Sequence, residues 1–318
     1  MSRHDWRATA KRGFKVLFFP AVVLLAGYLV WRISRQYALN DVLEAVGAIP
    51  TVRLLLAVGF AGASYLCLTG FDWLAVRYVG RPLPWRRCAL ASFTALSIGH
   101  NIGVAAFSSG AIRYRFYSRW GLSGSEIVKV IAFCALTVAL GLMILGGASL
   151  VLAPGLASEY TRLPLTVALL AGWLCLGLSA AYLVVCMFDW RPVRIGKYKL
   201  YVPPFHLALG QAIIGPLNFA MVAACLYQGV AAVQDVSYPA VAASYVIANV
   251  TGMISHVPGG LGVIESVILF LLGGGQVIGA VLVFRVVYFF LPLALGGTAF
   301  LLIEGGLLLR SRRDGQKR

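Results

Sequence analysis

Residues 255–266 read SHVPGGLGVIES, and their types and spacing suit the binding of an anion inside a membrane. The break at Pro258, Gly259 and Gly260 interrupts an apolar tract, which leaves unpaired N–H groups where the next helical segment begins. Partial positive charge at such a helix start can hold an anion, and glycines let a ligand approach the backbone closely. Glu265 lies about one turn further on, where it suits that positive end or pairs with a buried cation.

Arginines at two further places could take part in the same chemistry. Arg285 lies in the middle of the last apolar tract and is the obvious partner for Glu265 or for a phosphate. The planar guanidinium suits phosphate because it binds two oxygens at once. Arg113 and Arg115 follow an earlier break, where they either contact phosphate in a cytoplasmic cavity or act as topology signals at the membrane interface. Ionisable groups inside a membrane are costly, so these residues are functional candidates.

Neutral polar residues near the breaks are further candidates, each with an ordinary structural alternative. Membrane histidines commonly serve as satisfied hydrogen-bond partners, asparagines tie helices together, and tyrosines pack. Asp72, near the end of an earlier apolar tract, is expected to pair with Arg77 or with an arginine of the first break. The candidate head-group site comprises Arg113, Arg115, Asn249, His256, Pro258, Gly259, Gly260, Gly262, Glu265, Arg285 and Tyr288, with His100, Asn101 and Asn218 as weaker members.

The sequence offers no catalytic constellation. Ser and His residues near the breaks lack a matched acid, and there are no paired carboxylates and no Walker loop. The six cysteines fall in apolar segments without a CxxC motif or a histidine spacing suited to zinc. We therefore expect no enzyme activity, no cofactor and no metal site.

Composition indicates which elements must position these residues. The 318-residue chain is 60% hydrophobic and 12% charged, against about 25% charged in soluble domains. Apolar stretches of about 20 residues recur without strand-like alternation, which predicts an all-α polytopic membrane protein with one domain over residues 1–318. The net charge of +16 does not indicate nucleic-acid binding, because the positive residues lie in short loops beside apolar spans.

Six apolar runs are long enough to cross a bilayer. The basic N-terminus precedes an uncleaved first helix, and an amphipathic stretch over residues 40–50 is expected to lie in the interface. Lys and Arg in the loops place both termini in the cytoplasm. The expected spans are about residues 16–31, 54–79, 126–152, 164–188, 205–230 and 276–303.

Two further tracts are interpreted as re-entrant hairpins. Residues 89–120 contain GAIRYRFYSRW, which is too polar to face lipid, so we expect them to enter from the cytoplasm, turn at residues 108–110 and return. Residues 240–272 enter from the outside, because the part after the Pro-Gly-Gly break is too short to span a core of about 30 Å.

The two hairpins show a slight sequence relationship. A shift of 149 residues places residues 101–113 over residues 250–262, with Gly103 over Gly252 and Gly110 over Gly259. Chance explains so slight a match equally well. Opposed, related broken helices are typical of inverted-repeat transporters, so a possible inverted repeat is part of the expected fold.

The PGGLGVIE motif resembles the PGGLG-x-x-E signature of the lysylphosphatidylglycerol synthetase transmembrane family, whose flippase-like domain also occurs as stand-alone proteins. The NIG…GAIRYRFY segment and the long last helix are similar as well, and the resemblance covers about residues 10–310. The first hairpin departs from the family pattern at Ser108-Ser109, where Pro and a basic or polar residue are typical of the family. Matching the motif carries over Pro258, Gly259, Gly260, Gly262 and Glu265.

This resemblance implies a bacterial inner-membrane protein that moves lipid between leaflets. A synthase domain is absent from this sequence, so lysyl transfer is not expected, and the substrate is an anionic or modified phospholipid or a related lipid. The alternative is a non-transporting partner that presents lipid to a separate synthase or glycosyltransferase. An intramembrane lipid enzyme is the third class, and it would need a matched acid and base. The expected partners are membrane lipids, with a separate lipid-modifying enzyme under the alternative function, and no nucleic acid.

Overall fold

A computed structural model describes residues 39–102, 105–152, 154, 164–188, 193–195, 198–200, 202–273 and 275–316. The helices of the first part are α2 (Leu39–Ala48), α3 (Thr51–Tyr78), α4 (Trp85–Ile102), α5 (Ala105–Arg119), α6 (Gly124–Leu152) and α8 (Leu165–Cys186). The strands β1 (Val193–Ile195) and β2 (Tyr198–Leu200) follow. The second part contains α9 (Phe205–Val233), α10 (Tyr238–Ser255), the 3-10 turn η1 (Pro258–Gly260), α11 (Val263–Leu272), α12 (Val277–Arg285), the π-helix η2 (Val286–Phe290) and α13 (Leu291–Gln316).

Within these residues, five helical stretches are long and apolar enough to cross a membrane. They are Thr51–Tyr78, Gly124–Leu152, Leu165–Cys186, Phe205–Val233 and Val277–Gly306. They correspond to five of the six expected spans, and the expected first span, residues 16–31, lies outside the described residues. The expected amphipathic stretch is confirmed as helix α2. The regular secondary structure of the described residues is helical apart from the short antiparallel ribbon of β1 and β2.

Small residues allow the spanning helices to approach closely. A Cβ placed on Gly141 of α6 would lie 2.6 Å from the carbonyl carbon of Gly215 of α9. A Cβ on Gly147 of α6 would lie 2.9 Å from the carbonyl oxygen of Gly172 of α8. Helices in a membrane associate through such close packing, because lipid tails are as apolar as the side chains they would replace.

Helices α4 and α5 pack along each other as a hairpin, and α10 and α11 form a second hairpin. The turn of the first hairpin was expected at residues 108–110, and this is wrong, because α5 begins at Ala105. Ser109 and Gly110 lie inside α5, where their small size serves packing. Ser109 lies against Gly99 of α4, and a Cβ on Gly110 would lie 3.2 Å from Ile131 of α6.

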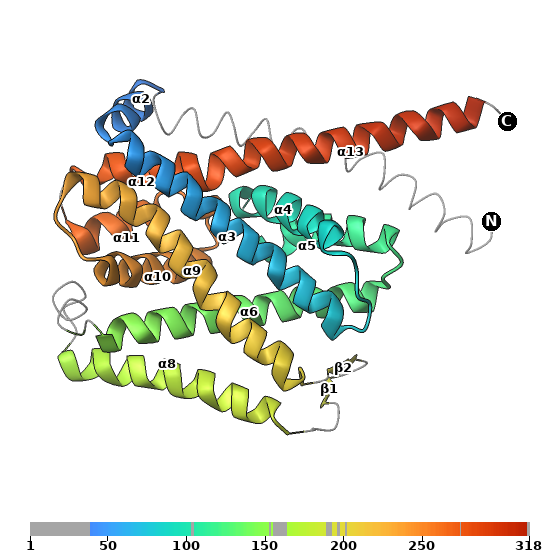
Figure 1. Ribbon diagram of the computed structural model, residues 1–318, viewed down its shortest axis with the longest axis horizontal. Coiled ribbons are helices and arrows are strands. Elements are labelled where there is room, and N and C mark those ends of the chain that lie inside the picture. Colours follow the sequence, from blue (N-terminus) through green and yellow to red (C-terminus); the bar gives the residue numbers. More distant parts are fainter. Residues whose placement is uncertain are drawn as a thin grey trace.

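The hairpins lie at opposite ends of a crossed helix pair. Helices α3 and α9 run antiparallel, with Leu74 of α3 packed against Gly210 of α9. Figure 1 shows α4 and α5 near the C-terminal end of α3, and α10 and α11 near its N-terminal end. The tips of the two hairpins meet between these ends, where η1 contacts α4.

Three of the helix starts recur along the chain with a nearly constant offset, whereas α11 begins 158 residues after α5. Helix α9 begins 154 residues after α3, α10 begins 153 after α4, and α12 begins 153 after α6. The contacts recur too, since α4 packs on α13 while its counterpart α10 packs on α6. The shift of 149 residues suggested by the glycines differs from these offsets between helix starts by four or five residues.

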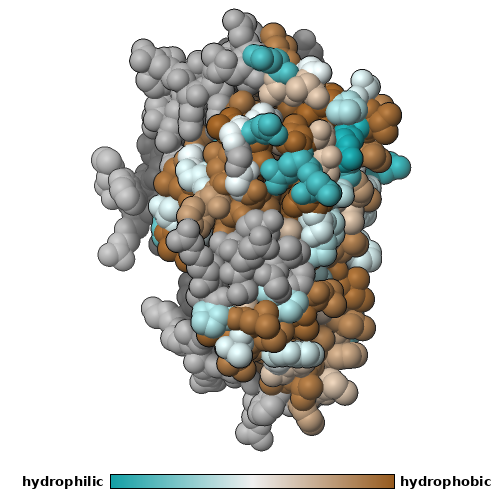
Figure 2. Space-filling view, turned by 90° about the vertical axis from the view of Figure 1, so that its left-hand side faces the viewer, coloured by the Kyte–Doolittle hydropathy of each residue, from teal (hydrophilic) through white to brown (hydrophobic). Residues whose placement is uncertain are grey.

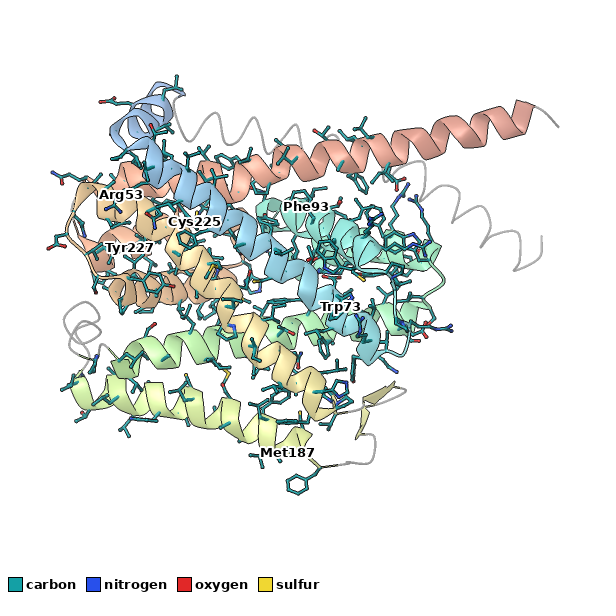
Figure 3. The ribbon with its side chains drawn as sticks, in the orientation of Figure 1. Arg53, Trp73, Phe93, Met187, Cys225 and Tyr227 are labelled. Carbon is teal, nitrogen blue, oxygen red and sulfur yellow. The ribbon has the colours of Figure 1, made fainter. Side chains whose placement is uncertain are left out.

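Charge distinguishes the two ends of the bundle. Five arginines of the described residues lie in the loop from α3 to α4, at the start of α4 and near the end of α5, namely Arg81, Arg86, Arg87, Arg115 and Arg119. These segments lie at the right-hand end in Figure 1. Figure 3 shows nitrogen-bearing side chains gathered there around α4 and α5, with Arg53 at the opposite end. That opposite end faces the viewer in Figure 2 and is largely hydrophobic, with hydrophilic residues gathered in its upper half. We call the right-hand end of the bundle in Figure 1 the arginine-rich end.

Candidate functional site

The two hairpin tips touch inside the bundle. A Cβ on Gly259 would lie 3.5 Å from the carbonyl oxygen of Asn101 and 3.6 Å from that of His100, both near the end of α4. The Asn101 amide donates to the carbonyl oxygen of Ser97, at 2.9 Å, and to that of Phe289 in η2, at 3.3 Å. The end of α4, the η1 turn of the second hairpin and the π-helix η2 therefore meet at one place.

Arg285 holds the tip of the second hairpin. Its Nε and Nη2 donate to the two carboxylate oxygens of Glu265, at 2.6 and 2.9 Å. Its Nη1 and Nη2 also donate to the carbonyl oxygens of Gly259 and Gly260. The guanidinium lies 4.6 Å from the centre of the Phe289 ring, and the side chain is 1% exposed. Of the two partners left open for Arg285, the structure shows Glu265.

The glycines of the motif have conformations that other residues adopt only under strain. Gly259, Gly260 and Gly262 have φ angles of +64°, +58° and +81°. Gly262 precedes α11, and its N–H donates to the carboxylate of Glu265 at 2.9 Å. Glu265 thus caps the start of α11 and also pairs with the cation Arg285. The sequence had allowed either role for it.

The first hairpin is held by a second buried ion pair. Nε and Nη2 of Arg113 donate to the carboxylate oxygens of Asp72 on α3, at 2.9 and 2.8 Å, and Nη1 donates to Ser109. The Tyr117 hydroxyl donates to the same carboxylate at 2.7 Å. Asp72 therefore pairs with a hairpin arginine and not with Arg77.

Arg77 lies instead over the ring of its neighbour Trp73, which Figure 3 labels on α3. Its guanidinium carbon is 3.2 Å from the ring centre, and Nη1 donates to the carbonyl oxygen of Trp73. Arg77 is thus satisfied on its own helix, which leaves Asp72 to the first hairpin.

A third carboxylate, Glu304 of α13, was missed by sequence reasoning. Arg115 donates to its Oε2, and Arg119 contacts it at 2.6 Å to Oε1 and 2.9 Å to Oε2. The signal was present, because AFLLIEGGLLL contains a single carboxylate in an apolar run. Arg115, predicted as a site residue, is therefore joined to the last helix at the arginine-rich end.

Hydroxyl and amide groups link the spanning helices near the tips. Ser64 of α3 donates to Asn218 of α9 at 2.7 Å and lies 3.0 Å from the Tyr288 hydroxyl. The ring of His100 stacks on that of Tyr288 with centres 6.3 Å apart. The weaker candidates His100, Asn101 and Asn218 thus join Tyr288 in one central cluster.

Two predicted site residues are not joined to this cluster by their hydrogen bonds. Asn249 donates to the Tyr245 hydroxyl within α10, and the imidazole of His256 bonds the carbonyl oxygen of Ile254. His256 has a φ of 55° and ends α10, where it is exposed. Its role in the structure is that of a left-handed helix end, a position favoured by Gly or Asn.

Comparison with known proteins gives two relatives over most of the chain. The chain is 34% identical over 287 residues to the uncharacterized protein slr0712 of Synechocystis sp., which covers 89% of this chain and 88% of the relative. It is 31% identical to the inner membrane protein YbhN of Escherichia coli over 95% of each chain. No family model matches the chain. With its five candidate spans and this relationship, the chain is a multi-pass membrane protein that belongs to the family of the inner membrane protein YbhN.

Proposed function

We propose that this protein moves an anionic or modified phospholipid, or a related lipid, between the leaflets of the bacterial inner membrane. One observation carries the proposal, namely that two helical hairpins approach from opposite ends of the bundle and touch where Gly259 of the second meets the end of α4 in the first. Broken helices of this kind, in two related halves, line the substrate path of many transporters. The similarity of PGGLGVIE to the lysylphosphatidylglycerol synthetase transmembrane family supports the same function.

The proposed halves are residues 51–152 and 205–306, related as an inverted repeat with an offset of 153 or 154 residues. Support comes from the recurrence of helix starts and helix contacts. It also comes from the crossing point of α3 and α9, where Ser64 and Asn218 lie at the same distance from the start of their helices. The hairpins are proposed to be re-entrant, since α4, α5, α10 and α11 are not among the helices suited to span.

The ion pairs suggest how such halves would move. Arg113 and Asp72 both belong to the first half, and Glu265 and Arg285 both belong to the second. Breaking a buried pair costs about 3–5 kcal/mol, so each hairpin is held firmly within its own half. The contacts between the tip of the first hairpin and the second half, in contrast, are van der Waals contacts and a hydrogen bond between uncharged groups. The halves can therefore rock against each other while the pairs stay intact.

Arg285 and Arg113 act in this mechanism as clamps and not as head-group ligands. Four hydrogen bonds to Glu265, Gly259 and Gly260 already occupy Arg285. A lipid head group would instead meet the tips from the side where they separate. The acyl chains would remain in the surrounding lipid.

The test is translocation by the purified protein in proteoliposomes that contain fluorescent phosphatidylglycerol, with dithionite added outside. Glu265→Gln keeps the size of the side chain and removes the charge that orients Arg285, so we expect translocation to fall about tenfold or more. Glu126→Gln is the matched control, because Glu126 forms a surface ion pair with Arg81. Equal rates for Glu265→Gln and the unchanged protein would contradict the role of the tip.

Absence of translocation by the unchanged protein would favour the alternative function, a partner that presents lipid to a separate enzyme. Head-group conversion would indicate an enzyme instead. Thermal unfolding of each variant in detergent shows whether a lost rate reflects a lost fold.

A further inference from the structure

We propose that His100 is a proton-binding residue that couples lipid movement to protons, and that its imidazolium form pairs with the phosphate of the lipid head group. The inference rests on the proposed lipid transport and names the charge that meets an anionic head group between the hairpin tips. It is carried by the place of His100 at the contact between the hairpins, by its unsatisfied ring nitrogen and by the charges that surround the ring.

His100 lies where the two hairpins touch. It belongs to the last turn of α4, and its carbonyl oxygen would lie 3.6 Å from a Cβ on Gly259 in η1. Its ring stacks on that of Tyr288 in η2, with centres 6.3 Å apart, and the ring of Tyr65 in α3 lies at the same distance. Elements of both proposed halves therefore surround the imidazole, so a separation of the halves at this place changes its environment.

One nitrogen of the imidazole is buried without a hydrogen bond. Nδ1 of His100 has no hydrogen-bond partner among the described residues. Its neighbours are satisfied, since the Asn101 amide makes two hydrogen bonds and the Tyr288 hydroxyl lies 3.0 Å from that of Ser64. Buried polar atoms without partners are costly and therefore few in native proteins. With the ring proton on Nε2, the lone pair of Nδ1 can take up a second proton, and histidine is the side chain whose ordinary pKa of about 6.5 suits this near neutral pH.

The charges of the first half oppose a positive imidazole. Among the described residues, the charge that acts on the ring is that of Arg113 on α5, whose partner Asp72 on α3 is engaged in the ion pair at 2.8 Å. The titratable group that faces the ring from α3 is the hydroxyl of Tyr65, which donates to the carbonyl oxygen of Tyr288 at 3.4 Å. A like charge nearby and removal from water both disfavour an imidazolium, so the touching state holds His100 uncharged.

The second half does not supply a counterion for the imidazole either. Glu265 is engaged by Arg285, which also bonds the carbonyl oxygens of the η1 turn. The group that faces the ring from η2 is the uncharged phenol of Tyr288. Both carboxylates next to the tips, Asp72 and Glu265, are thus held by arginines, and a proton on His100 needs an anion from outside. Lipid phosphate is such an anion, and an imidazolium donates hydrogen bonds from both ring nitrogens.

These charges define a cycle in which protons balance. When the halves rock apart, water reaches the ring and one proton moves from water to Nδ1 of His100. The imidazolium keeps the tips apart until a lipid phosphate pairs with it, so one negative charge and one proton are carried together without net charge. When the tips separate toward the other side, the lipid leaves and Nδ1 returns its proton to water.

The first measurement follows the tips without transport. Hydrogen–deuterium exchange of the detergent-purified protein at about pH 5 and about pH 8, which bracket the ordinary pKa of histidine, gives protection factors for residues 97–102 and 257–262. Each factor is taken relative to the unfolded peptide at the same pH. The separated state binds one proton more than the touching state, so protection of both segments should fall about tenfold at the lower pH. His100→Gln should remove this dependence, and His206→Gln is the matched control because His206 is exposed in α9.

The second measurement follows lipid and proton together. Proteoliposomes with a pH-sensitive dye inside and an acidic outside should take up fluorescent phosphatidylglycerol faster than at equal pH, with one proton entering per lipid. His100→Gln should lose the effect of the gradient. Zwitterionic phosphatidylcholine should bring in no proton, because its head group carries its own positive charge. Vesicles of phosphatidylcholine with inorganic phosphate outside test the free anion, and no proton uptake is expected from them.

The outcomes separate this proposal from the proposed function. Protection that does not depend on pH, or that depends on it equally in the unchanged protein and in His100→Gln, would overturn the proton site. Lipid movement without proton uptake would overturn the coupling and leave the proposed function intact. Proton uptake with inorganic phosphate alone would overturn the role of the lipid head group. A protein whose tips respond to pH through His100 but which moves no lipid would contradict the proposed function and support the proton site.

A second variant keeps the proposal testable should His100→Gln not fold. The chain has four histidines, so replacing His4 and His206 by Gln and His256 by Asn leaves His100 alone. Asparagine suits the left-handed backbone of His256. This variant should keep the full pH dependence of protection at both tips. Loss of the dependence in this variant would assign it to another histidine and overturn the proposal.

Discussion

Ser64 donates a hydrogen bond of 2.7 Å to the side-chain oxygen of Asn218, and the 154 residues between them equal the offset between the starts of α3 and α9. Two antiparallel helices that cross at the same position of each are related by a local two-fold rotation. This bond therefore lies where the axis of the proposed inverted repeat would pass. It joins the halves by a neutral contact, which suits a pivot.

The first prediction concerns this bond. Ser64→Ala should lower the free energy of unfolding by about 1 kcal/mol, because the hydroxyl links α3 to α9 and Tyr288. Ser179→Ala is the control, since that hydroxyl donates to the carbonyl oxygen of Cys175 in its own helix. Thermal unfolding in detergent gives both values. Equal melting temperatures for the two variants would show that the bond contributes nothing between helices.

The second prediction concerns the clamp at Arg285. Lysine retains the charge of arginine but cannot hold a carboxylate and two carbonyl oxygens together, so Arg285→Lys should cost about 3 kcal/mol. Arg77→Lys should cost far less, because Arg77 lies over Trp73 at the surface. Chemical unfolding of the two variants compares them. A similar small cost in both would remove the argument that Arg285 holds the hairpin tip.

The third prediction grades the glycines of the second hairpin. Gly259→Ala should cost about 1–2 kcal/mol for its left-handed backbone, since the nearest atoms leave room for a methyl group. Gly260→Ala should cost more, because its Cβ would also lie 2.9 Å from Ile264. Gly252→Ala, inside α10 with ordinary contacts, should be tolerated. Melting temperatures in any other order would contradict this account of the motif.

The fourth prediction tests the topology. Single cysteines at Arg86 and Arg119, in a chain whose six native cysteines are replaced, should react with an impermeant thiol reagent from the same side of the membrane. Cysteines at Asp235 and Gln276 should react from the other side. All four positions are exposed, so labelling does not require opening. Opposite sidedness within either pair would mean that its hairpin crosses the membrane.

The local pattern of the sequence determined much of the fold. Runs of apolar residues fix helices by their length, so five spans were found close to their observed bounds. The spacing of Ser123 and Glu126 predicts a capping box, and both of its hydrogen bonds are present. The break at Gly259 and Gly260 was visible because proline and glycine interrupt helices through their own backbone preferences. Such features depend on neighbours in the chain, which is why sequence suffices for them.

The partners of the charged residues were decided by the tertiary structure. Asp72 had either Arg77 or an arginine of the first hairpin as its expected partner, and the packing of α5 against α4 and α6 selected Arg113. Glu304 pairs with Arg115, which is 189 residues away in the chain, because of where α13 is placed in the bundle. Ser109 and Gly110 looked like a turn and proved to be packing positions within a helix. Ion pairs and close contacts between distant segments depend on the relative placement of whole helices, and no local pattern of residue types contains that placement.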